Sequence, residues 1–66
     1  MNYLVEYQMR SPIHPDRTLH TIDGIFDTEA DAREHAAWAL AENGGTVTIH
    51  RGHGLRPTEL VDAITE

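Results

Sequence analysis

The sequence predicts an α+β domain in which a three-stranded sheet carries one main helix, in the order ββαβ, with a short C-terminal helix. Apolar and polar residues alternate over 3–9 and 46–51, as in half-buried strands. Between them lies an alanine-rich segment with a cap at each end, which is typical of a helix. Sixty-six residues are enough for one domain, 1–66.

The first strand is expected over 3–9, with Tyr3, Val5 and Tyr7 on one face. Residues 11–17 contain two prolines and no periodicity, so they form a loop. A second strand follows over 19–26 and pairs with the first as a hairpin. Asp23-Gly24 interrupts its alternation, which indicates a β-bulge.

The helix is expected to begin after Thr28, whose hydroxyl accepts a hydrogen bond from the amide of Asp31. It runs to about Glu42, and Asn43-Gly44-Gly45 ends it with a left-handed turn. A helical wheel predicts an inward stripe centred on Leu40, with Trp38 on the outer side. The predicted stripe comprises Ala30, Arg33, Ala36, Ala37, Leu40 and Ala41.

The third strand is expected over 46–51, followed by a loop over 52–56. Residues 57–64 are expected to form the short helix, because Leu60 and Ile64 are one helical turn apart and Pro57 suits a first turn. One face of the sheet then needs a cover, which either this helix or a partner supplies.

Eleven acidic residues oppose five basic ones, all of them Arg, so the net charge is −6. Such a chain repels phosphate backbones and favours a partner with a basic surface, so no direct nucleic-acid binding is predicted. There is no Cys and no apolar run of membrane-spanning length. A cytoplasmic protein without a membrane partner is therefore expected.

Trp38 is the strongest candidate for a partner contact, because an exposed Trp among acids is typical of an interface anchor. The alternative is that the C-terminal segment folds over the indole. The predicted partner-binding residues are Trp38, Asp31, Glu34, Glu42 and Arg51, with Asp27 and Glu29 extending the acidic face. That face is either a docking surface or simply a solvated helix side.

Two histidines, His50 and His53, are the candidate metal ligands. On a strand they point to opposite faces unless the chain bends at Gly52, so no metal or other cofactor is predicted. Catalysis lacks a Cys nucleophile, and Ser11, the single Ser, lies in the proline-flanked loop. A chain this small rarely encloses a substrate pocket, so the protein is not expected to be an enzyme.

Residues 26–51 resemble the small phage-encoded inhibitor of bacterial RNA polymerase, an α/β protein of similar length. The resemblance implies binding at the rim of the polymerase DNA channel through basic residues of the last strand. Arg51 matches one such position, and Ile49 stands where another basic residue is found. The matching positions are Thr28, Ala32, Glu34, Ala36, Trp38, Gly44, Val47, Thr48 and Arg51.

The predicted function is therefore that of a non-enzymatic, acidic protein-binding module. It would act as a phage-like inhibitor or regulator of a larger nucleic-acid-handling protein such as RNA polymerase. One alternative is an acidic DNA mimic that blocks a nuclease or defence complex, in the manner of an anti-CRISPR protein. Others are a His-rich metal-binding protein and a structural homodimer joined through the uncovered sheet face.

Overall fold

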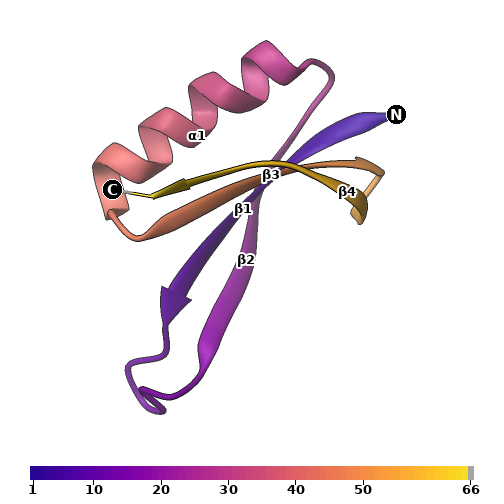
Figure 1. Cartoon of the computed structure of the whole chain (residues 1–66). Coiled ribbons are helices and arrows are strands. Elements are labelled where there is room, and N and C mark those ends of the chain that lie inside the picture. Colours follow the sequence, from indigo (N-terminus) through magenta and orange to yellow (C-terminus); the bar gives the residue numbers. More distant parts are fainter. Residues whose placement is uncertain (66) are drawn as a thin grey trace.

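A computed structural model describes residues 1–65. It contains a four-stranded antiparallel sheet in the order β2-β1-β3-β4, with one helix packed on one face (Figure 1). Each strand pairs antiparallel with its neighbours, and β1 and β3 form the centre. The elements are β1 (Asn2–Arg10), β2 (Thr18–Phe26), α1 (Glu29–Asn43), β3 (Thr46–His53) and β4 (Arg56–Thr65).

The expected three-stranded sheet with a C-terminal helix is wrong, because the last segment is a fourth strand. Strand β3 continues to His53, and Gly54, with φ of 58°, turns the chain back into β4. Both side-chain amide atoms of Asn2 hold this turn through the backbone of Gly54, at 2.7 and 2.9 Å. The segment gains a ladder of backbone hydrogen bonds from β3, interrupted at two register shifts, which a lone two-turn helix would lack.

The core lies between α1 and the two central strands. Val5 of β1 is opposite Ile49 of β3, and Tyr7 is opposite Val47. Val5, Val47 and Ile49 are fully buried beneath the helix. The half-buried residues packed around this core are Tyr3, Tyr7, Phe26, Leu40, Val61 and Ile64.

The inward face of α1 differs from the predicted stripe. Its buried residues are Ala32, Ala36 and Ala39, while Leu40 is only half-buried. Arg33 and the predicted inward alanines Ala30, Ala37 and Ala41 are exposed. Because alanines occur on every side of this helix, hydrophobicity alone could not identify the face that packs closest to the sheet.

Both predicted helix caps are confirmed. The Thr28 hydroxyl accepts from the amide of Asp31 at 3.2 Å. At the other end Gly44 has φ of 69°, and its amide donates to the carbonyl of Leu40 at 2.8 Å. A side chain is disfavoured at this φ, so Gly44 ends the helix without strain.

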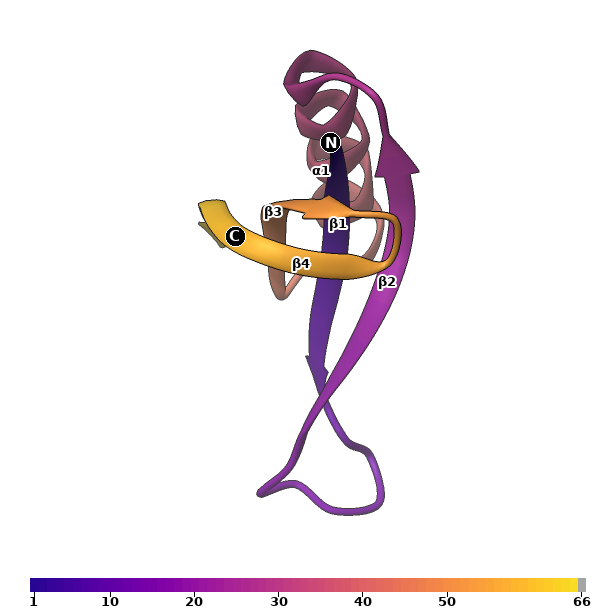
Figure 2. The ribbon, with the colours of Figure 1, turned by 90° about the vertical axis from the view of Figure 1, so that its right-hand side faces the viewer.

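The sheet is strongly twisted, and the β1–β2 hairpin projects beyond the end of α1 (Figures 1 and 2). The loop at its tip is tied together by Ser11, which is itself buried. The Ser11 hydroxyl accepts from the amides of Ile13 and His14, at 3.3 and 3.2 Å. The hairpin contributes to the longest dimension of the molecule, 35 Å. In residues 1–65 no helix is both long and apolar enough to cross a membrane.

Candidate functional site: an aromatic–acidic groove

The outer side of α1 and the end of β2 form an open groove of about 480 Å³. Its lining residues are Phe26, Asp31, Glu34, His35 and Trp38. Asp31, Glu34 and Trp38 are spaced by three and four residues, which places them along one side of a helix. We call this feature the aromatic–acidic groove.

A bulge in β2 brings the strand side of the groove into position. Val5 is opposite Gly24 and Glu6 is opposite Ile22, so Asp23 is the extra, unpaired residue. This confirms the bulge predicted at Asp23-Gly24. The Asp23 carboxylate accepts a hydrogen bond from Nε2 of His35 at 2.7 Å. The bond fixes the imidazole against the sheet edge.

Gly24 provides the space for the aromatic floor of the groove. A Cβ atom at this position would lie 2.6 and 2.7 Å from two ring carbons of Phe26. The Phe26 ring therefore occupies the volume that any other residue at 24 would need. The rings of Phe26, His35 and Trp38 form a row. The Phe26 and His35 ring centroids are 5.0 Å apart, and those of His35 and Trp38 are 5.4 Å apart.

Trp38 ends this row of rings and is 57% exposed. The alternative that the C-terminal segment covers the indole is wrong, because β4 lies at the opposite edge of the sheet from β2. A large aromatic side chain that is left this open loses much of the free energy that burial would supply. It is therefore available to a binding partner.

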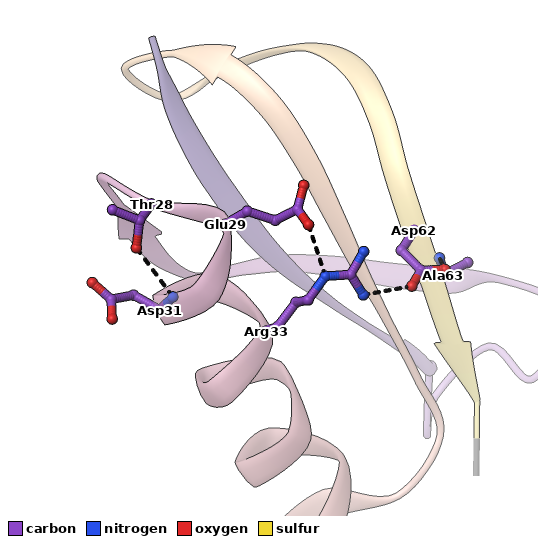
Figure 3. Close-up of polar contacts among 6 residues, drawn as sticks. All are labelled: Thr28, Glu29, Asp31, Arg33, Asp62 and Ala63. Carbon is purple, nitrogen blue, oxygen red and sulfur yellow. Dashed lines mark hydrogen bonds and ion pairs between the residues drawn. The ribbon is translucent and has the colours of Figure 1, made fainter.

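The two sides of α1 differ in whether their acidic side chains are paired with a basic one. On the β4 side, Arg33 donates to Glu29 at 3.0 Å and to Asp62 at 2.8 Å (Figure 3). Asp31 points away from this pair on the other side of the first turn (Figure 3). Within residues 1–65 no cationic group forms an ion pair with Asp31 or Glu34. The groove side thus keeps free negative charge.

The Arg33–Asp62 pair gives a testable pH dependence. Its hydrogen bond from Arg33 lowers the pKa of Asp62 below its ordinary value of 3.8, and the Ala63 amide adds to this effect. A lowered folded-state pKa stabilises the fold above the unfolded-state value, and the contribution is lost as pH falls through the folded-state pKa. Asp62→Asn should therefore lower the melting temperature at neutral pH, and the difference should shrink as the pH falls below the ordinary pKa of 3.8.

Thermal unfolding followed by circular dichroism between about pH 2 and pH 7 measures this difference. Asp16→Asn is the matched control, because Asp16 lies in the exposed loop and makes no ion pair within the described chain. A melting difference between wild type and Asp62→Asn that stays constant down to the lowest pH would contradict the assignment.

The other predicted site residues lie elsewhere. Glu42 is exposed near the end of α1 and does not line the groove. Asp27 precedes the helix, and Glu29 is held by Arg33. Arg51 donates to Glu59 at 2.9 Å, and its guanidinium carbon lies 5.9 Å from the centre of the Tyr3 ring. Tyr3, and after it Glu59, raise the pKa of Arg51, and both contacts hold the side chain along the sheet.

The two candidate metal ligands are also separated from the groove. His50 lies on the sheet face away from the helix, with Nδ1 3.9 Å from a carboxylate oxygen of Glu6. His53 is exposed at the end of β3. In the described part of the chain, no three His, Asp or Glu side chains converge as metal ligands would.

The predicted partner-binding residues lack three members of this site: Asp23, Phe26 and His35. The available signal was the Asp-Gly bulge, since an extra residue in an edge strand redirects neighbouring side chains. His35 is also four residues after Asp31 and three before Trp38, so it shares their side of the helix.

Aromatic faces beside free carboxylates suit a cationic side chain. A guanidinium group can stack on an indole and hydrogen-bond to a carboxylate at the same time. The groove is open, and its geometry suits recognition of such a group. Neither a family model, nor a curated protein, nor a solved structure matches this chain.

Proposed function

We propose that this protein is a non-enzymatic protein-binding module that docks its aromatic–acidic groove onto a basic surface of a larger protein. The observation that carries the proposal is the exposed Trp38, which ends a row of rings beside two unpaired carboxylates. Trp and Arg are both enriched among the residues that contribute most binding energy in protein interfaces. Asp31 and Glu34 supply the charge that an incoming Arg needs.

The charge of the whole chain supports the same kind of partner. A net charge of −6 steers it toward basic surfaces, such as the clefts of nucleic-acid-handling proteins. Bacterial RNA polymerase is the first target to test, because the resemblance over 26–51 includes Glu34 and Trp38. Arg51, the residue to which that resemblance assigns a contact, is already engaged by Glu59, so we assign the contact to the groove instead.

Mimicry of DNA is the second candidate, favoured by the carboxylates on the outer side of α1. Glu29 is neutralised by Arg33, which interrupts the acidic row and weakens this reading. The two candidates predict different responses to salt. A mimic that binds mainly by charge should lose affinity steeply as salt rises, whereas a contact anchored by Trp38 should lose less.

Calorimetric titration against purified bacterial RNA polymerase and against a short Arg-rich peptide tests the proposal. Trp38→Ala should weaken binding about 30-fold, equivalent to about 2 kcal/mol, because it removes the stacking surface. Glu34→Gln should weaken binding less, since one carboxylate remains. The same peptide with citrulline in place of arginine should bind poorly, because it keeps the shape and loses the charge.

Leu55→Ala is the matched control, because Leu55 is a large exposed apolar residue at the β3–β4 turn, away from the groove. Its affinity should equal that of the wild type. Binding of either probe that is indifferent to Trp38→Ala would refute the groove as the docking site. Binding of the peptide without the polymerase would retain the recognition chemistry and reject that target.

A further inference from the structure

The sheet face opposite α1 is uncovered in residues 1–65, and we call it the open face. Alternation along the strands and the pairing register place its members side by side. Leu4 is opposite both Ile25 and His50, and Glu6 is opposite both Ile22 and Thr48. The open face comprises Leu4, Glu6, His20, Ile22, Ile25, Thr48, His50 and Leu60.

This face has a shielded centre and an exposed apolar rim. Leu4 and Thr48 are buried by their neighbours. Ile22, Ile25 and Leu60 are 42%, 47% and 57% exposed, and they come from the two edge strands. Three large aliphatic side chains around one surface form the kind of patch that protein interfaces bury.

The acidic residues of the described chain avoid the open face, with the exception of Glu6. Asp62 and Asp23 are bonded to helix residues Arg33 and His35, so both are on the α1 side. Glu59 binds Arg51, which stacks over Tyr3 on that same side. The remaining described acids, in the loops or on the helix, are Asp16, Asp27, Glu29, Asp31, Glu34 and Glu42.

Glu6 itself is flanked by two imidazoles. Its carboxylate accepts a hydrogen bond from Nδ1 of His20 at 2.8 Å. Nδ1 of His50 is 3.9 Å away, is shielded from solvent and has no hydrogen-bond partner among the described residues. At the centre of the open face, Glu6 thus lies between two histidines that can donate hydrogen bonds to its carboxylate. Within residues 1–65, neither Arg nor a free carboxylate accompanies them there.

This distribution of acidic residues indicates which partner binds the open face. Two copies of a chain with net charge −6 repel each other, and the repulsion is smallest when they approach through the surface with the fewest acidic residues. A basic partner is drawn to the α1 side instead. The small core, without Cys for disulfides, also belongs to the class of domains that gain stability by oligomerisation.

We infer that the open face is the contact surface of a symmetric homodimer. Two sheets pack face to face at about 10 Å, and a twofold axis brings the same patch of each copy together. The rim residues Ile22, Ile25 and Leu60 of one copy then bury those of the other.

Sedimentation equilibrium of the full chain over a range of concentrations tests this inference. The expected result is a species of twice the 7.4 kDa chain mass that dissociates on dilution. Leu60→Glu and Ile22→Glu should each weaken dimerisation at least ~tenfold, because a carboxylate from each copy would be buried without a cation. Leu55→Glu, at the β3–β4 turn, adds the same charge outside the face and should leave the dimer intact.

Circular dichroism confirms that each variant is folded. A wild-type chain that stays at 7.4 kDa at every concentration overturns the inference. So does a dimer that survives both Ile22→Glu and Leu60→Glu, which would point to pairing along an edge strand. Trp38→Ala should leave the dimer unchanged, because Trp38 is on the α1 side, so this result is independent of the proposed docking through the groove.

Discussion

Replacing Ile49 with alanine is expected to lower the free energy of unfolding by about 3 kcal/mol. Ile49 is fully buried at the centre of β3, opposite Val5 and beneath the alanines of α1. The substitution removes its aliphatic side chain and leaves a cavity that the small neighbouring alanines cannot fill. A domain this small has only a few kcal/mol to lose, so a large share of the variant should be unfolded at 25 °C.

Urea unfolding followed by circular dichroism at fixed protein concentration measures this loss. Ile13→Ala is the matched control, because Ile13 lies in the hairpin loop and is 80% exposed. Its midpoint should coincide with that of the wild type. Equal midpoints for the Ile49 and Ile13 variants would mean that the core beneath α1 is not where the structure places it.

The second large effect is expected at Gly52, where alanine should cost about 2–3 kcal/mol through overpacking. A Cβ at Gly52 would lie 2.3 Å from the carbonyl oxygen of Arg56 and 2.9 Å from Cδ1 of Leu4. The carbonyl belongs to the backbone of the paired strand, so it cannot turn aside as a side chain can. The β3–β4 hairpin must shift to accommodate one methyl group.

Gly54 in the same hairpin provides the contrast. It has φ of 58°, and an added Cβ there would meet no atom within 4 Å. Alanine at Gly54 should therefore cost about 1 kcal/mol from backbone conformation alone. Urea midpoints of the two variants separate steric from conformational cost. A Gly52→Ala protein as stable as Gly54→Ala would show that the strands do not approach this closely.

Three strands and the helix could be predicted from the sequence, because alternation and capping are local signals. Apolar and polar residues alternate around Val5 and around Ile49, as they do in strands, and Thr28 and Gly44 mark the helix ends. The fourth strand could not be predicted in this way. Leu60 and Ile64 are spaced like neighbours on a helix, but a register shift in β4 places them on opposite sides of the sheet. Pairing with β3, a tertiary effect, decides the structure.

The candidate site was predictable in part for the same reason. Asp31, Glu34 and Trp38 share a helix side by spacing, and the structure brings them together in one groove. Asp23 and Phe26 join them only through the pairing of β2 with β1 and its bulge. The helical wheel predicts Glu42 beside Trp38 and the resemblance predicts a contact at Arg51, but neither residue lines the groove.

The helix lies on one face of the sheet only (Figure 2), so the aromatic–acidic groove beside α1 and the open face are on different sides of the sheet. With two open faces joined, the two Trp38 side chains point outward from opposite sides of the pair. The inferred homodimer would therefore carry two grooves and would be expected to bridge two copies of a target or two basic sites on one target. Once the groove of one copy is bound, the groove of the other encounters its site at a raised effective concentration. Two weak contacts can then give a long-lived complex.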